Sequence, residues 1–231
     1  MPFYYFDPTY ILVIIGAIIC MAASANVNST YRKYNRVGTS RRMAAKDVAQ
    51  EILQNAGIYD VRIEHISGEL TDHFDPRANV VRLSDSVYNS TSVAAIGVAA
   101  HECGHVIQHH EGYMPIKLRS AIVPIVNLGS KLSFPVILLG LFLGMTGMLK
   151  FGIWLFALTL LFQLVTLPVE FNASGRALKI LENRGLLYGD EVKGARKVLT
   201  AAALTYITAA VSTILQLLRL IILFGGNSRD D

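Results

Sequence analysis

Residues 92–110 read SVAAIGVAAHECGHVIQHH, and this stretch decides how the rest of the chain is interpreted. It contains no proline, and residues 90–92 (Ser-Thr-Ser) are typical of a helix start, so one long helix is predicted from there through His109. His101 and His105 lie four residues apart on one face of that helix, where both imidazoles can reach the same zinc ion. Glu102 can reach a water beside such a metal and act as general base.

Residues 101–105 form the motif H-E-x-x-H, for which chance gives about 0.005 occurrences in a chain of this composition. Alanine and glycine on the same helix allow the close packing that a buried active-site helix needs. Cys103 is two positions from His101 and therefore points about 200° around the helix, away from the metal. The alternatives are a surface helix with two coincident histidines and a purely structural metal site.

A hydrolytic zinc site needs a third protein ligand and one open position. His109 extends the same helical face, but eight residues of helix rise about 12 Å, which is too far from His101 for one tetrahedral centre. The metzincin pattern needs glycine and histidine where this chain has Gln108 and Glu111, so that class fits badly. His109 is better interpreted as a polar residue at a helix end.

Glu170 is the third candidate, within LPVEFNASGR (167–176). It follows Pro168, which can begin a helical turn, and Ser174 lies four residues later, where it can support a ligand. An interfacial carboxylate paired with Arg176 or a lysine fits the same spacing. The residues alone leave both interpretations open.

The chain of 231 residues is 52% hydrophobic and only 16% charged. Ordinary soluble domains hold about 25% charged residues, so a disordered chain is excluded and a wholly soluble globule is not expected. Four apolar stretches approach or reach the length of a membrane span: 10–25, 120–143, 151–169 and 201–224. The glycines and the lysine between 144 and 152 predict a turn. A cleaved signal peptide is disfavoured because no basic residue precedes the first stretch.

The basic residues lie beside the apolar stretches, mainly in 26–119 and 170–200. By the positive-inside rule, both termini face outward and both polar segments lie in the cytoplasm. The residues behind the net charge of +4 therefore do not form a basic face on a soluble domain, and no nucleic acid is expected as a partner. The six basic residues between 32 and 46 predict a topology signal or a lipid contact. Cys20 and Cys103 are expected to be free thiols.

The polar segment 26–119 is the only one with globular character. Its pattern predicts a helix over 44–56 and strands over 61–66 and 79–83, and residues 72–76 fit a turn ended by proline. The expected organisation is an N-terminal membrane helix (1–25), a cytoplasmic metallopeptidase region with the H-E-x-x-H helix (26–119), a transmembrane hairpin (120–169), a cytoplasmic helical segment (170–200), and a last membrane helix with a short tail (201–231).

Five stretches resemble the neutral zinc metallopeptidase family of bacterial membrane proteins, the YugP-like membrane proteases. They are LTDHFDP (70–76), VVRLSDSVY (80–88), SVAAIGVAAHECGHVIQH (92–109), LVTLPVEFNASGRAL (164–178) and AAALTYITAA (201–210), in order over most of the chain. The arrangement is also distantly similar to the HtpX and CAAX-prenyl membrane proteases, whose third zinc ligand is a glutamate on a later helix. The fold expected is mainly α, an integral membrane protein of about four helical spans. A small α+β gluzincin-like zinc metallopeptidase domain is expected at its cytoplasmic face.

The resemblance implies one zinc per chain, held by His101, His105 and Glu170, with Glu102 as catalytic base. The chain departs from the family pattern at Asn172, where an aspartate is usual. This departure affects the tuning of the site. Residues that can support the ligands or the oxyanion are Asn172, Ser174, Arg176 and His73. Val80, Val81, Arg82 and Leu83 are expected to form an edge strand that binds extended substrate.

These observations predict a membrane-embedded zinc metalloendopeptidase of the bacterial cell membrane, multi-pass, with its active site facing the cytoplasm. Its substrates would be proteins or peptides associated with the lipid bilayer, and a homo-oligomer or a membrane protein partner is compatible with the sequence. One alternative is a catalytically silent adaptor that uses the metallopeptidase fold to bind partners. Another is a structural zinc site in a channel or transporter, which the scarcity of polar residues along the spans disfavours.

Overall fold

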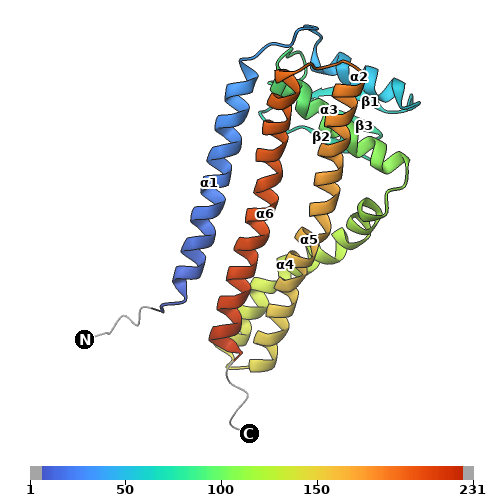
Figure 1. The fold of residues 1–231 in the computed structure, drawn as a ribbon. Coiled ribbons are helices and arrows are strands. Elements are labelled where there is room, and N and C mark those ends of the chain that lie inside the picture. Colours follow the sequence, from blue (N-terminus) through green and yellow to red (C-terminus); the bar gives the residue numbers. More distant parts are fainter. Residues whose placement is uncertain (1–6, 226–231) are drawn as a thin grey trace. The chain divides into compact units, whose positions relative to one another are not determined.

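The computed structural model describes residues 7–225, and these are mainly helical, with one three-stranded sheet (Figure 1). The elements in chain order are α1 (Tyr10–Asn35), α2 (Ala45–Asn55), β1 (Arg62–Ile66), β2 (His73–Asp75), β3 (Val80–Ser84), α3 (Val93–His110), α4 (Met114–Phe142), α5 (Thr146–Asn183) and α6 (Asp190–Phe224). The predicted mainly helical fold with a small sheet is confirmed.

Four of the helices, α1, α4, α5 and α6, are long and apolar enough to cross a membrane. They carry large apolar side chains on their outer faces, such as Trp154, which is 75% exposed, and Phe142, which is 84% exposed. Apolar surface of this extent is unfavourable in water and favourable against lipid. The four apolar stretches of the sequence therefore correspond to four long helices.

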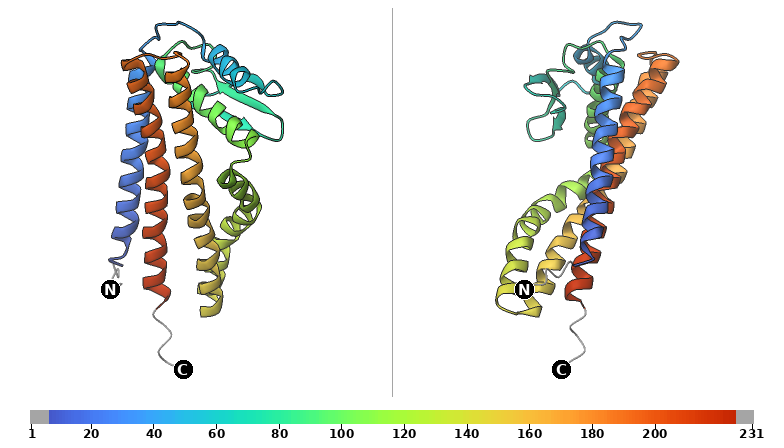
Figure 2. Two further views of the ribbon diagram at one scale, coloured as in Figure 1. Left: turned by 45° about the vertical axis from the view of Figure 1, so that its right-hand side comes forward. Right: turned by 90° about the vertical axis from the view of Figure 1, so that its left-hand side faces the viewer.

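Two expectations about the ends of these helices are wrong. The turn between α4 and α5 occupies only residues 143–145, and Gly152 lies inside α5, where a Cβ would stand 2.5 Å from Cγ1 of Ile137 on α4. This glycine therefore permits close helix packing, and the two helices lie side by side in both views of Figure 2. Pro168 also lies inside α5 and begins no new helix. Its ring removes one backbone donor, and the helix continues past it.

The chain forms two compact units. One contains Leu118–Thr166 together with the residues up to Ser24 and those from Thr205 onward. The other contains Ala25–Lys117 and Leu167–Leu204, and thus includes the sheet, α2, α3 and parts of α1, α5 and α6. All the candidate site residues belong to this second unit.

The sheet has the strand order β1-β3-β2, with β1 parallel and β2 antiparallel to β3. The expectation that Val80–Leu83 form an edge strand is therefore wrong, because β3 is paired on both sides. The segment 72–76, interpreted from sequence as a turn, contains strand β2, which pairs Phe74 with Val81. A strand of three residues is too short to show alternation. The turn follows it, where Oδ1 of Asp75 accepts hydrogen bonds from the N–H groups of Arg77 and Ala78.

The two faces of the sheet differ in polarity. Val81 and Leu83 of β3 are fully buried in the main core, with Phe74 of β2 packed against them and with residues of α2 and α3 in the same cluster. The opposite face carries a row of charged and polar side chains in register, from Glu64 on β1 through Arg82 on β3 to His73 on β2. Alternation along each strand thus places α3 against one face only.

Candidate metal centre

His101, His105 and Glu170 bring one ligand atom each into a group whose members all lie within 4.8 Å of one another. The two histidines come from α3 and the glutamate from the part of α5 in the same unit. His105 and Glu170 are buried, and His101 is partly buried. The helix that carries the histidines begins as predicted, since Oγ of Ser92 accepts a hydrogen bond from the N–H of Ala95.

The separations between these atoms fit a tetrahedral metal. Nε2 of His101 lies 3.1 Å from Nε2 of His105, and Oε2 of Glu170 lies 3.3 Å from the former and 3.7 Å from the latter. A tetrahedral zinc ion with bonds near 2.05 Å has its ligand atoms about 3.4 Å apart. The donor set of two imidazoles and one carboxylate, with a fourth position left over, is that of catalytic zinc sites. The residues present therefore fit zinc.

Gln108 fixes which nitrogen of His105 faces this group. Nε2 of Gln108 donates to the carbonyl oxygen of Val169, at 2.8 Å, and to Oδ1 of Asn172, at 2.9 Å. Because these acceptors define the amide orientation, it is Oε1 of Gln108 that faces Nδ1 of His105, at 3.0 Å. Nδ1 must then carry the proton, which leaves the Nε2 lone pair for a metal. Gln108 is fully buried, and no pattern in the sequence predicted this role for it.

Ser174 supports the other histidine. Its Oγ lies 3.1 Å from Nδ1 of His101. A hydrogen bond from Nδ1–H to this hydroxyl leaves Nε2 of His101 free of a proton as well. Two lone pairs 3.1 Å apart repel each other, and a cation between them removes the repulsion. Ser174 lies four residues after Glu170, and the sequence predicted from this spacing that it supports a ligand.

Asn172 and Arg176 continue this network away from the ligands. Oδ1 of Asn172 accepts from Gln108 and, at 2.7 Å, from Nε of Arg176. The guanidinium of Arg176 also donates to Oε2 of Glu111 at 2.6 Å. Glu111, which occupies the third-ligand position of metzincins, is thus an ion-pair partner. The interpretation of Glu170 as a partner of Arg176 gains no support from these contacts.

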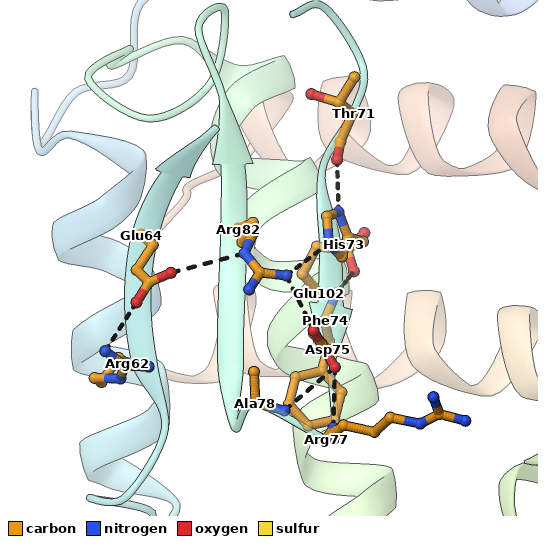
Figure 3. A network of polar contacts seen from close by, with 10 residues as sticks. All are labelled: Arg62, Glu64, Thr71, His73, Phe74, Asp75, Arg77, Ala78, Arg82 and Glu102. Atoms are coloured by element: carbon orange, nitrogen blue, oxygen red, sulfur yellow. Dashed lines mark hydrogen bonds and ion pairs between the residues drawn. The ribbon is translucent and has the colours of Figure 1, made fainter. Parts of the chain in front are cut away.

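Glu102 is buried beside the group and contacts the edge strand. Its Oε2 accepts a hydrogen bond from the backbone N–H of Phe74, at 3.0 Å (Figure 3). Since this N–H points away from β3, Phe74 belongs to a non-hydrogen-bonded pair of the ladder, and its carbonyl points in the same outward direction. One carboxylate oxygen of Glu102 is therefore held by β2, and the other remains for a water or substrate.

Asp72 connects β2 to the end of β3. Its two carboxylate oxygens accept hydrogen bonds from the N–H of Ser84, at 2.7 Å, and from the hydroxyl of Ser84, at 2.9 Å. The Ser84 hydroxyl lies 3.3 Å from that of Ser86, which accepts from the Tyr31 hydroxyl of α1 at 3.0 Å. Burial raises the pKa of the Asp72 carboxyl. The motif LTDHFDP was the only sequence signal for this residue.

Gly104, inside the motif, lets α3 and α5 approach each other. A Cβ at this position would stand 2.7 Å from the carbonyl oxygen of Ala173. Only glycine permits this contact, which places the residues around Ala173, Glu170 among them, against the histidine face of α3. The expected close packing of small residues on this helix is therefore present.

The electrostatics of the group favour a cation. Burial lowers the pKa of His105, but the hydrogen bond with Glu170 and the charges of Glu102 and Glu170 outweigh it, and the pKa lies above its ordinary value. Two carboxylates therefore lie beside the imidazole of His105 and favour a positive charge there. A divalent cation compensates this excess of negative charge.

Three other residues singled out from the sequence lie elsewhere. His109 is exposed, with its ring 5.8 Å from that of Phe74. Cys103 is buried, its Sγ 3.6 Å from the carbonyl oxygen of Ala49, and burial raises the pKa of its thiol far above the ordinary value. His73 contacts Arg82 and the carbonyl of Thr71 on the polar face of the sheet, as Figure 3 shows.

Comparisons with known proteins agree with this geometry. A family model described as "Putative neutral zinc metallopeptidase" matches residues 9–225. A curated relative, "Putative membrane protease YugP" of Bacillus subtilis (strain 168), is 43% identical over 223 residues, which cover 96% of this chain and 99% of the relative. No solved structure matches the chain.

Proposed function

Since the chain belongs to the neutral zinc metallopeptidase family, we propose that it is a membrane-embedded zinc metalloendopeptidase. One observation carries the proposal. Three ligand atoms converge at tetrahedral spacing: Nε2 of His101, Nε2 of His105 and Oε2 of Glu170. Glu102, the residue after His101, adds a carboxylate. This combination is what hydrolysis of a peptide bond by an activated water requires.

His101, His105 and Glu170 would hold the zinc ion, which supplies Lewis acidity and an acidified water when bound. Glu102 takes the proton of the attacking water as the bond between water oxygen and carbonyl carbon forms. It then passes that proton to the leaving amine as the C–N bond breaks. The hydrogen bond from Phe74 holds one oxygen of Glu102, so that the other faces the water. Gln108 and Ser174 keep the imidazoles in the ligating tautomer.

We assign the binding of extended substrate to β2 in place of β3. β2 is the edge strand that contacts Glu102. At Phe74 its N–H is held by Glu102, and its carbonyl points outward from the sheet and can accept from a substrate backbone. A substrate backbone laid along this edge can add a strand to the sheet, so that its scissile bond lies near the base. His73 contacts Arg82, and Arg176 contacts Asn172 and Glu111, so the oxyanion role expected of His73 or Arg176 stays a prediction.

The proposed location is the bacterial cell membrane, with the metallopeptidase unit in the cytoplasm. The distribution of basic residues supports this orientation. A protease anchored by several helices meets extended segments close to the lipid surface, so we propose membrane-associated proteins or unfolded segments as substrates. Labelling of a cysteine at position 150 from the cytoplasm, or at position 184 from outside, would contradict this topology.

The first experiment measures zinc content and proteolysis on the detergent-purified protein. Wild type should hold about one zinc per chain, and Glu170→Ala should lose most of it. Glu102→Gln should keep the zinc and lose at least about 100-fold in cleavage of an unfolded casein probe. Glu51→Gln, an equal change on the exposed side of α2, is the control and should behave as wild type.

Three results would overturn the proposal. Undiminished zinc in Glu170→Ala would mean that the third ligand is another residue. Equal cleavage by Glu102→Gln and wild type would exclude Glu102 as the base. Zinc in the wild type without cleavage by any form, together with unchanged recovery of a partner protein by Glu102→Gln, would instead favour the adaptor.

A further inference from the structure

A cavity of about 380 Å³ lies between α1 and α6, within the unit that holds the metal group but apart from the metal ligands. Its lining includes three cationic side chains, Lys33 of α1 and Arg196 and Lys197 of α6. Thr30 and Thr200 add hydroxyl groups from the same two helices. No acidic residue lines it, so all the formal charge around the cavity is positive.

Helix geometry brings these side chains together. Thr30 and Lys33 are three residues apart on α1, and Arg196 and Thr200 are four apart on α6, so each pair shares a helix face. Gly194 lets the helices approach, because a Cβ there would stand 2.8 Å from the ring of Tyr34, which also lines the cavity. The cavity therefore results from a specific helix contact and its position is fixed by the fold.

Within the part of the chain that the structure describes, the three cations form no ion pair. Among residues 7–225, neither Lys33 nor Arg196 nor Lys197 has a carboxylate oxygen within 4.0 Å. The acids at the start of α6 have other direct partners: Asp190 pairs with Lys193, at 2.8 Å, and Glu191 bonds to Ser40. Asp190 attracts Lys197 only at longer range. Three like charges around one cavity repel one another, and a bound anion turns this repulsion into attraction.

The cavity also has an apolar side that faces the candidate spans. Ala201 and Leu204 line it, and the Leu204 side chain is 40% exposed. Beyond Leu204, α6 continues as an apolar stretch, and the residues of α1 before Asn26 are apolar as well. The cationic part thus lies where the apolar part of both helices ends, which is the level of lipid headgroups for helices that cross a bilayer.

We propose that this cavity binds the phosphate headgroup of an anionic phospholipid, whose acyl chains lie along the apolar parts of α1 and α6. A phosphate diester matches the cations and hydroxyls, and the acyl chains match Leu204 and the residues beyond it. Free inorganic phosphate shares the headgroup chemistry but has nothing to place on the apolar side. The proposal stands independently of the proposed protease activity.

The test uses the full-length protein in neutral detergent, with bound lipid counted by native mass spectrometry. Wild type should retain one phosphatidylglycerol per chain and no phosphatidylcholine. The variant Lys33→Gln/Arg196→Gln/Lys197→Gln should bind phosphatidylglycerol roughly 100-fold more weakly, at about fivefold per cation. The control Arg77→Gln/Lys179→Gln/Arg184→Gln removes equal charge outside the cavity and should bind as wild type. Circular dichroism verifies the fold of both variants. If the triple variant does not fold, Arg196→Gln alone takes its place and should bind phosphatidylglycerol about fivefold more weakly than wild type.

Three results would overturn the proposal. One is equal loss of lipid from the cavity and control variants, which would mean diffuse electrostatic attraction. Another is phosphatidylcholine retained as well as phosphatidylglycerol, which would exclude headgroup charge as the basis of binding. The third is full displacement of phosphatidylglycerol by inorganic phosphate at equal concentration, which would identify a free phosphate site.

Discussion

The backbone N–H of Phe74 donates a hydrogen bond to Oε2 of Glu102, at 3.0 Å. This contact joins the edge strand of the sheet to the residue proposed as general base. The strand in turn is fixed at both ends, by Asp72 on Ser84 and by Asp75 on Arg82. The position of the base is thus set by a strand of three residues and by two carboxylates that never touch the metal.

Asp72→Asn should misplace the base while sparing the metal. An asparagine can accept only through Oδ1, so the charge-assisted hydrogen bonds to the carboxylate are lost, and the Ser84 hydroxyl must turn to accept from the N–H₂ group. We expect kcat to fall roughly 10- to 100-fold, with zinc content unchanged. Ser84→Ala keeps the backbone donor and should have a smaller effect. Wild-type kcat in Asp72→Asn would show that β2 does not depend on this residue.

Gln108→Leu should weaken zinc binding without touching a ligand. The leucine has a similar volume but leaves Nδ1 of His105 without a partner in a buried site and removes the donor to the carbonyl of Val169. Outer-shell partners of this kind are worth about 10- to 100-fold in metal affinity. Competition with a chromophoric chelator gives the zinc dissociation constant. An affinity equal to that of wild type would mean that His105 keeps its tautomer unaided.

Gly104→Ala should separate α3 from α5. Its Cβ would meet the Ala173 carbonyl oxygen at 2.7 Å, and a backbone atom cannot move without the helix. We expect a loss of about 1–3 kcal/mol of stability together with weaker zinc binding. Gly175→Ala on α5 is the control, because nothing lies within 4 Å of its Cβ. That variant should be stabilised by about 0.5–1 kcal/mol, as alanine is the better helix former.

Asn172→Asp should preserve the site. Both hydrogen bonds at Asn172 are accepted by Oδ1, from Gln108 and from Arg176, and a carboxylate oxygen accepts them equally well. We expect zinc content and kcat/KM to change less than about tenfold, whereas Asn172→Leu, which has no acceptor, should lower both. If the aspartate variant loses its zinc, the uncharged side chain is a requirement of this particular chain.

The turn after β2 should open at low pH. The hydrogen bond from Arg82 and those from the backbone of Arg77 and Ala78 hold the pKa of Asp75 below its ordinary value of 3.8. A carboxyl whose pKa is depressed by folding stabilises the fold above its unfolded pKa, and this contribution is lost as pH falls through the folded pKa. The protection of residues 73–80 against hydrogen exchange, relative to the intrinsic rate at each pH, should therefore hold down to about pH 4 and fall below it. Asp75→Asn should show faster exchange already at pH 6.

The pair His101 and His105 was predictable from sequence because both lie on one helix, and helical periodicity alone places them on a common face. The four apolar helices were predictable for a similar reason, since length and composition are local properties. The ends of these helices were not, because Gly152 and Pro168 are breakers by local rules and are accommodated here by packing against α4 and by the continuing helix.

Everything that depends on contacts distant in sequence required the tertiary structure. Glu170 lies 65 positions after His105, and only the crossing of α3 and α5 at Gly104 brings its carboxylate to the imidazoles. β2 forms because β3 supplies a partner, so that an apparent turn becomes the edge strand and the expected edge strand becomes the centre of the sheet. Gln108 acquires its role from Val169 and Asn172 on another helix, and no pattern within residues 92–110 specifies that contact. The sequence by itself determined the chemistry that each local segment can offer, and the long-range packing decided which of these groups meet.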